Sequence, residues 1–280
     1  DRRQRQMCIR DRNNPAKQKK VKTKKQKAIA ATCAVAFWLL VWHVVSLCVG
    51  SELVLVSPVK VVQTLFTVIF DPDFLKTVWY SAARILGGFF TALTLGTVLG
   101  WVASRFWVVE TLLRPITAVI KATPVASFII LVLLWFSGKN LSVIISMLMV
   151  FPVIYMNVLE GIRSADKKLL EMAQVFRLSV SKKLLYIYLP AVAPFFVSAC
   201  SVSLGLCWKS GIAAEVIGTP DGSIGAVFYQ AKIFLQTSEL LAWTVVVVAV
   251  SVAFEKLFML LLRLILKKLK MEDVLNGKRA

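Results

Sequence analysis

The segment from Glu171 to Pro190 has the most specific spacing of polar and apolar residues in this chain. Glu171 opens it, Met172 and Ala173 follow, and Ile187 and Leu189 come just before Pro190. The segment pairs no nucleophile with a general base, so it offers no route to catalysis. The segment can instead provide a surface that contacts another molecule.

Two short helices are expected in this segment. Ser164 is placed to cap the first, and Ser179 precedes the second. Apolar residues share one face in each helix: Leu169, Met172 or Ala173, and Phe176 in the first, and Leu184, Leu185 and Tyr188 in the second. Helices this short are not stable alone in water. They need something to pack on, either the bilayer surface or a protein partner.

Lys209 and Glu215 are the other ionisable candidates, both near the end of an apolar run. Lys209 lies 19 positions after Pro190, which is about 28 Å along a helix. This distance favours the outer interface of a membrane over its centre. A position lining a polar pathway stays open for both residues.

Metal, cofactor and nucleotide chemistry have no support in the sequence. The five cysteines have no C-x-x-C spacing, and His43 is the single histidine. The cysteines are Cys8, Cys33, Cys48, Cys200 and Cys207. Buried free thiols explain Cys200 and Cys207, and no phosphate-binding G-x-x-x-x-G-K-[ST] motif occurs. We therefore expect no metal, no cofactor and no enzymatic activity in this chain.

The composition indicates an all-α, polytopic membrane protein. The chain of 280 residues is 58% hydrophobic and 18% charged, whereas soluble domains are about 45–50% apolar. Runs of about 17–25 apolar residues can cross a bilayer as helices. About six such runs occur, over residues 28–49, 85–104, 122–138, 141–160, 191–213 and 241–265. The third and fourth runs are separated by only a few residues, which predicts a tight hairpin.

The distribution of Lys and Arg predicts the orientation. Residues 1–27 carry 12 Lys and Arg against 2 Asp, and the 162–189 loop is also basic, whereas the 214–240 loop is acidic. By the positive-inside rule, both termini and the 162–189 loop are cytoplasmic. The net charge of +19 is thus a topology signal. Because it is confined to segments that flank the membrane, we expect lipid and no nucleic acid as a partner.

This topology divides the chain into three parts. A basic cytoplasmic tail covers residues 1–27, a transmembrane domain with its cytoplasmic loop covers 28–265, and a cytoplasmic tail covers 266–280. The first dozen residues, DRRQRQMCIRDR, resemble translated adapter sequence and are left out of the fold argument.

Small residues recur every four positions in the second apolar run. They are Gly88, Ala92, Gly96 and Gly100. This spacing puts them on one face of a helix, where another helix backbone can approach closely. We expect a helix-packing ridge there. Arg84 and Lys121 are expected at helix ends, where their side chains can reach the interface.

The spacing in the 171–190 segment resembles that of the cytoplasmic loop of permeases of the nitrate, sulfonate and taurine class, which belong to ATP-binding cassette (ABC) importers. The pattern is an acid, a small residue, Ala, a turn six positions after the acid, an aliphatic residue, and Leu-Pro. It departs from the family at Met172, where Ala is usual, and at Arg177, where Gly is usual. The similarity extends over about residues 55–265. Further matching positions are Ser57-Pro58, Arg84 to Gly100, Pro124 with Leu134-Trp135-Phe136, Ala214-Glu215 and Gly222 to Gly225.

The resemblance implies a type I ABC importer permease with a MetI-like fold, in the inner (plasma) membrane of a bacterium. Its partners would be a separate ABC ATPase subunit that uses the ATP, an extracytoplasmic solute-binding protein and a second permease copy, most simply as a homodimer. The residues that would couple to the ATPase are Glu171, Met172, Ala173, Arg177, Ile187, Leu189 and Pro190. Glu171 would contact a basic residue of the ATPase, Ala173 would permit close docking, and Pro190 would start the fifth span.

Three other functions are weighed against the importer. An ion-coupled secondary transporter usually has ionisable groups at mid-membrane and inverted repeats, and neither is evident in the sequence. A membrane-embedded enzyme would need convergent catalytic groups, and a structural membrane anchor would need no partners. The transported solute cannot be read from these residues.

Overall fold

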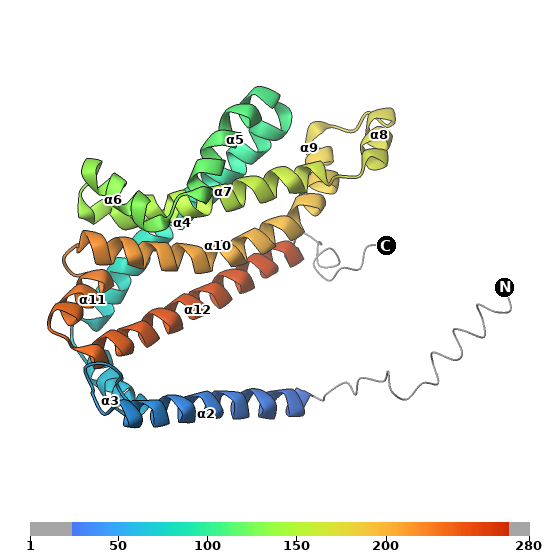
Figure 1. Ribbon diagram of the computed structural model, residues 1–280. Helices are drawn as coiled ribbons and strands as arrows, with labels where there is room; N and C mark the ends of the chain where they lie inside the picture. Colours follow the sequence, from blue (N-terminus) through green and yellow to red (C-terminus); the bar gives the residue numbers. More distant parts are fainter. Residues whose placement is uncertain (1–23, 269–280) are drawn as a thin grey trace, which may run out of the picture. The chain divides into compact units, whose positions relative to one another are not determined.

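The computed structural model describes residues 24–268. Most of the two predicted tails lies outside these residues, including the adapter-like first dozen and Cys8. The described chain is helical, and no strand occurs within it (Figure 1). It divides into two compact units, residues 1–59 and 60–280, which are described separately.

The first unit contains one long helix, α2 (Lys24–Val49). Large apolar side chains such as Phe37, Trp38 and Leu47 are exposed along it, as expected for a helix surrounded by lipid. Ser46, in the last turn of α2, donates a hydrogen bond of 3.0 Å from its Oγ atom to the carbonyl of Leu55, which follows the helix. This helix corresponds to the predicted span 28–49.

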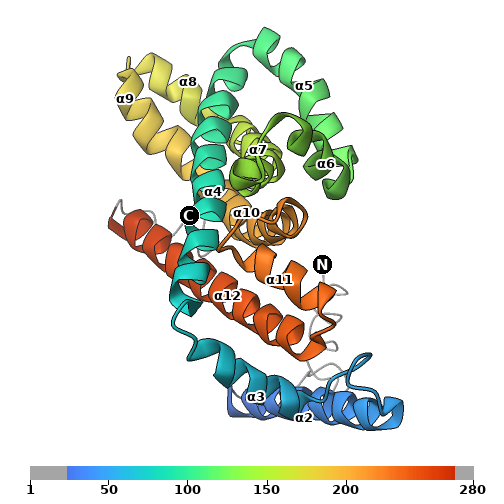
Figure 2. The same ribbon diagram turned by 90° about the vertical axis from the view of Figure 1, so that its left-hand side faces the viewer.

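Four long helices form the frame of the second unit: α4 (Phe74–Arg105), α7 (Gly138–Arg163), α10 (Leu189–Gly218) and α12 (Thr237–Lys268). Helix α7 packs along both α4 and α10, and α12 packs against α10 (Figure 2). With α2, five described helices are long and apolar enough to cross a membrane. They contain the predicted first, second, fourth, fifth and sixth apolar runs.

The predicted third span, 122–138, is not a single helix. Two helices, α5 (Trp107–Ala122) and α6 (Val125–Trp135), meet at a bend of 110° instead. Thr123 precedes Pro124 and is extended, because the proline ring disfavours helical geometry in the residue before it. Since α6 has only 11 residues, or about 16 Å of helix, the pair together forms at most one broken span.

A short amphipathic helix, α3 (Pro58–Ile69), starts directly after Ser57 and contains the boundary between the two units. Its Val68 is part of the buried cluster of the second unit. A turn follows, in which Asp71 Oδ1 accepts a hydrogen bond of 2.8 Å from the Asp73 amide. Helix α4 then begins at Phe74, so Arg84 lies inside a helix rather than at the expected helix end.

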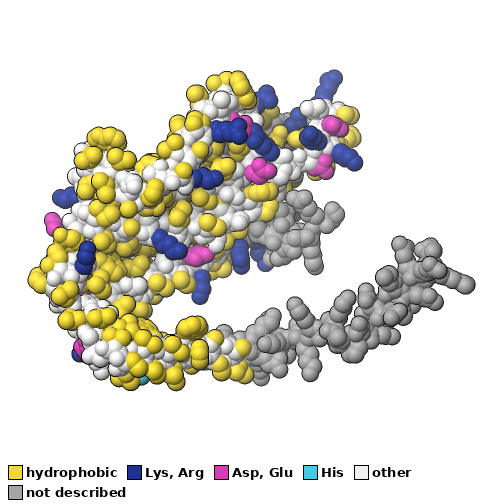
Figure 3. Space-filling model, viewed as in Figure 1, with side chains coloured by type: hydrophobic (Ala, Val, Ile, Leu, Met, Phe, Trp, Pro, Cys, Tyr) yellow, Lys and Arg dark blue, Asp and Glu magenta, His cyan; other side chains and the backbone are white. Residues whose placement is uncertain are grey.

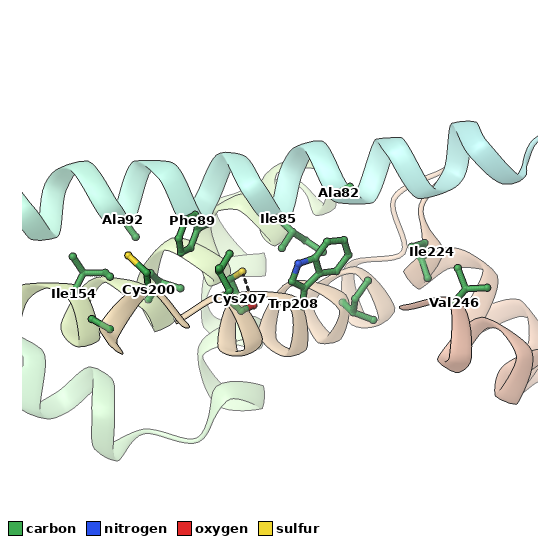
Figure 4. Packing of buried hydrophobic residues seen from close by; sticks show 14 of the residues in the cluster. Ala82, Ile85, Phe89, Ala92, Ile154, Cys200, Cys207, Trp208, Ile224 and Val246 are labelled. Atoms are coloured by element: carbon green, nitrogen blue, oxygen red, sulfur yellow. Dashed lines mark hydrogen bonds between the residues drawn. The ribbon is translucent and has the colours of Figure 1, made fainter. Parts of the chain in front are cut away.

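The core of the second unit lies where α4, α7, α10 and α12 meet. Ile85 and Phe89 of α4 are fully buried, and Cys200 and Cys207 of α10 are free, buried thiols as predicted. Figure 4 shows these residues beside one another, with the Cys207 thiol donating a hydrogen bond to the Leu204 carbonyl. The centre of the core is therefore mainly apolar, with a few buried hydroxyl groups such as that of Ser146.

The surface of the second unit is mostly apolar along the long helices. Figure 3 shows Lys, Arg, Asp and Glu side chains gathered around α5 and α8, where α8 covers Lys167–Val175. In the same view, a basic side chain and an acidic side chain also lie near each other in the region of α10 and α12. The charged side chains around α8 belong to the 162–189 loop, and those around α5 lie beside that loop.

Candidate functional site

The 162–189 loop folds into α8 and α9 (Val180–Lys183), followed by a π-helical turn, η2 (Leu184–Tyr188), that continues into α10. Two short helices were predicted here, but the cap is a different residue. Asp166 accepts a hydrogen bond of 2.9 Å from the Lys168 amide and caps α8. Ser164 instead ends α7, and its hydroxyl donates to the Gly161 carbonyl.

Arg177 adopts a left-handed conformation (φ +49°) at the end of α8. The Arg177 amide donates to the Gln174 carbonyl (3.0 Å), and the Leu178 amide donates to the Ala173 carbonyl (2.9 Å). These two bonds form a Schellman motif, which usually has glycine at the left-handed position. Arg177 therefore forms a left-handed turn of the kind that glycine usually forms.

The loop has a small apolar core of its own. Ala165, Ala173 and Ile187 are buried together, and Leu170 and Leu178 pack against them. Ala173 has no exposed surface. Its small side chain lets α8 pack closely against Ile187, so any effect of Ala173 on docking would act through the shape of α8, and the predicted role in docking stays a prediction.

The outer face of α8 combines charge with apolar surface. Glu171 is exposed, and so are Met172, Val175 and Phe176. A cluster of exposed apolar side chains with one carboxylate is typical of a protein-contact surface. We call this set, together with Leu169, the α8 surface.

The end of this loop differs from the expectation for the fifth span. Pro190 lies in the first turn of α10, but the chain is already helical before it. The Leu189 amide donates to the Leu184 carbonyl, a π-type bond in η2. Because proline cannot donate, the wider turn accommodates Pro190 without breaking the helix, and α9, η2 and α10 run on as one helical path.

An ion pair ties the base of the loop to α5. Arg163, the last residue of α7, pairs with Glu110 in the first turn of α5. The two residues line a groove of about 280 Å³ together with Tyr155. Helix α5 was not expected from the sequence, because its charged residues lower the hydropathy of the 107–122 segment.

Residues Gly88, Ala92, Gly96 and Gly100 are buried on the side of α4 that faces α7. A Cβ at Gly88 would lie 2.4 Å from the Val143 carbonyl oxygen, and one at Gly96 would lie 3.0 Å from Ile154 Cβ. At neighbouring Gly87, nothing lies within 4 Å of such an atom. The two helices thus approach closely only along this ridge.

Glu215 lies in α10 with no exposed surface. Ser81 Oγ of α4 donates a hydrogen bond of 2.6 Å to its Oε2 atom. The same serine oxygen accepts a bond of 2.9 Å from the Ile224 amide, and the Gly225 amide lies 3.4 Å from Glu215 Oε2. These amides are the first two of α11 (Ile224–Ile233). The carboxylate therefore joins α4 and α10 to the N-terminus of α11, where a negative charge is favourable.

Gly225 is needed for this arrangement, because a Cβ there would lie 2.3 Å from the Glu215 backbone. Arg84 is close enough to interact electrostatically with Glu215. Its guanidinium carbon lies 4.4 Å from the centre of the Tyr80 ring, a cation–π contact. Glu215 is thus enclosed by other residues of this chain, whereas Lys209, the other candidate for a pathway, is exposed.

One ionisable pair escaped the sequence analysis. Glu255 and Lys256 lie in the middle of α12, within the predicted span 241–265. Ser201 Oγ of α10 donates a hydrogen bond of 2.8 Å to Glu255 Oε1. The predicted span therefore contains two ionisable residues that were not considered when the ion-coupled transporter was weighed. The two charges could have been found by examining that run residue by residue instead of by its average hydropathy.

Comparisons with known proteins agree with this architecture. The family model of the binding-protein-dependent transport system inner membrane component matches residues 92–271. The chain is 29% identical to the aliphatic sulfonates transport permease protein SsuC of Bacillus subtilis (strain 168), over 82% of this chain and 83% of that protein.

Two other relatives have similar coverage. The chain is 27% identical to the taurine transport system permease protein TauC of Escherichia coli (strain K12), over 76% of this chain and 80% of the relative. It is 26% identical to the nitrate import permease protein NrtB of Synechocystis sp. (strain ATCC 27184 / PCC 6803 / Kazusa), over 72% and 76%. Together with the helical architecture, the match over more than half of the chain shows that this protein belongs to the family of binding-protein-dependent inner-membrane transport permeases, with the MetI-like fold of type I ABC importers.

Proposed function

We propose that this chain forms the solute pathway of an ABC importer and couples ATP hydrolysis on a separate ATPase to solute uptake. The observation that carries the proposal is the α8 surface. It is held by a loop with its own buried core and a Schellman turn, so it is preorganised, yet its apolar side chains and Glu171 are exposed. An exposed set of this kind supports a protein partner at the cytoplasmic end of the helices.

The partner that fits is an ABC ATPase with a basic residue opposite Glu171. Closure of such a subunit around ATP would move α8. Two connections would carry this movement from the loop into the membrane. One is the continuous helix through α9, η2 and α10. The other is the ion pair between Arg163 at the base of the loop and Glu110 of α5. The remaining partners in this proposal are an extracytoplasmic solute-binding protein and a second copy of the chain, with both termini of each copy in the cytoplasm.

The solute in this proposal is small and carries a negatively charged group. The relatives are named for aliphatic sulfonates, taurine and nitrate, and each of these has an anionic oxygen group. Family membership favours an ATP-driven importer over an ion-coupled transporter, even though α12 carries charges in its middle.

The proposal is tested by co-expressing the chain with the ATPase and binding protein encoded beside it. Co-purification of the ATPase, and uptake in proteoliposomes that requires ATP and loaded binding protein, are the expected results. Uptake that is independent of ATP and abolished by a proton or sodium ionophore would contradict it and indicate a secondary transporter.

A further inference from the structure

A groove of about 500 Å³ with mostly apolar walls and a few charged side chains lies between α10 and α12. Its lining includes Ser201 of α10 and, from α12, Glu255, Lys256, Met259 and Arg263. Ser201 Oγ donates a hydrogen bond of 2.8 Å to the Glu255 carboxylate. Adjacent residues on a helix do not face each other, so Glu255 is held by Ser201 while Lys256 lines the groove separately.

The depth of these charges restricts what the groove can face. Helix α12 has 32 residues, and Glu255 and Lys256 lie about 4–5 Å from its midpoint along the axis. Each of the two charges lies at least 12 residues from either end of α12, which is about 18 Å of helix. Charged side chains at such depth face a bundle interior or a water-filled cavity rather than lipid. This side of the protein therefore faces water or a polar partner surface in the membrane.

An open face of α10 continues from the groove toward Lys209. Ser198, Val202, Gly205 and Lys209 recur every three or four residues, which places them on the same face as Ser201. Ser198, Val202 and Lys209 are exposed, and nothing lies within 4 Å of a Cβ built at Gly205. The face combines small and polar residues along about 16 Å of helix.

We propose that this groove and the open face of α10 line the route of the solute, and that their positive charge selects solutes with a negative group. The inference rests on the proposed permease function. Lys209, Lys256 and Arg263 oppose one carboxylate, Glu255. Cations in excess in a cleft with apolar walls raise the local concentration of anions and lower that of cations. Ser201 and Glu255 add one hydroxyl and one acceptor that can orient a solute.

Thiol labelling of the assembled transporter in membranes tests this lining. In a background with the native cysteines replaced, Met259→Cys places a thiol in the groove, and Leu257→Cys places one outside it, at similar depth on an exposed apolar part of α12. The probes are two methanethiosulfonates of similar size, one bearing a sulfonate and one a trimethylammonium group. We expect Met259→Cys to react with the sulfonate reagent about tenfold faster than with the cationic one, and Leu257→Cys to react with neither.

Adding Lys256→Gln and Arg263→Gln to Met259→Cys should remove most of the preference for the sulfonate reagent. If Met259→Cys is as unreactive as Leu257→Cys, the groove is dry and the proposal is overturned. If it reacts but shows no charge preference, or keeps the preference without the two cations, the selectivity part is overturned.

Uptake gives an independent readout. Lys256→Gln should reduce ATP-dependent uptake of an anionic solute at least about tenfold, whereas Lys256→Arg should retain most of it, and both variants should assemble with the ATPase. Normal uptake by Lys256→Gln would contradict a role in the pathway. The unmodified chain distinguishes failure of this proposal from failure of the permease function. If the chain is not an importer permease, the unmodified complex shows no ATP-dependent uptake, whatever the labelling pattern.

Discussion

Ser81 and Glu215, 134 positions apart in the sequence, are joined by a hydrogen bond of 2.6 Å inside the protein. The serine oxygen also accepts the Ile224 amide, so a single hydroxyl links two long helices to the start of α11. Glu215 is fully buried. A buried carboxylate that loses a donor bears the full cost of its desolvation, and this makes the pair a structural junction rather than a pathway-lining site.

Removing the hydroxyl at this junction should destabilise the protein. Ser81→Ala leaves Glu215 without its shortest hydrogen bond, at an expected cost of about 1–3 kcal/mol or more. Thermal unfolding of the purified protein in detergent should show a lowered midpoint. Gly205→Ala is the control, since its new methyl group meets nothing within 4 Å. Equal midpoints for Ser81→Ala and the unmodified protein would show that the junction contributes no stability.

The ridge on α4 predicts opposite effects at two neighbouring glycines. Gly87→Ala should be neutral or stabilise by about 0.5–1 kcal/mol, because alanine favours helix and the site is open. Gly88→Ala should destabilise, because its Cβ would overlap the Val143 carbonyl of α7. Unfolding midpoints of the two variants measure the difference directly, and the same sign of shift for both would remove the basis for the ridge.

A larger change at the ridge should also abolish function. Gly96→Leu forces α4 away from Ile154 and Tyr155, so assembly or uptake should be lost. Leu95→Phe enlarges an exposed position one residue away and should be milder. Comparable losses in uptake and in the yield of complex would argue against close packing as the reason.

Arg177 is expected to tolerate glycine better than a β-branched residue. A non-glycine residue in the left-handed region costs about 1–2 kcal/mol, so Arg177→Gly should strengthen the Schellman turn and slow proteolysis of the loop. Arg177→Val should do the reverse, because β-branched residues are genuine outliers at positive φ. Faster cleavage of Arg177→Gly than of the unmodified loop would indicate that the arginine side chain itself holds the turn.

The predicted orientation is tested by reporter fusions or cysteine labelling after residues 60, 139, 175, 225 and 275. We expect outside, outside, cytoplasm, outside and cytoplasm, in that order. The bent α5–α6 pair must cross the membrane once for this pattern to hold. A cytoplasmic signal after residue 225 would contradict the topology.

Features that depend on local composition could be predicted from the sequence. Five long apolar helices and the two short helices of the loop follow from hydropathy and periodicity, although the cap of α8 is Asp166 and not Ser164. The break at Thr123 and Pro124 was missed because α5 carries charges that interrupt the apolar run. The signal was nevertheless present, since a residue before proline tends to leave helical geometry.

Features that depend on distant contacts could not be predicted. The burial of Glu215 requires Ser81 and the start of α11 to lie beside it, and no spacing in the sequence encodes that meeting. The burial of Ala173 likewise depends on the return of Ile187 to α8. Only the tertiary structure shows whether such residues are buried or exposed, and their roles depend on that.

We propose that Glu171, on the exposed face of α8, transmits the state of a partner ATPase to the membrane helices. A charge buried in that contact leaves its counterpart unpaired when it is removed, at a cost of about 3–5 kcal/mol. Asp221→Ala is the matched control, because this exposed carboxylate lies in the turn between α10 and α11, away from the loop.

The most direct measurement compares ATP-dependent uptake by the unmodified complex, Glu171→Ala and Asp221→Ala in the same proteoliposomes. We expect Glu171→Ala to insert normally into the membrane but to lose uptake and the stimulation of the ATPase by loaded binding protein. Asp221→Ala should change little. Normal uptake and normal ATPase assembly with Glu171→Ala would show that Glu171 does not couple the ATPase to transport.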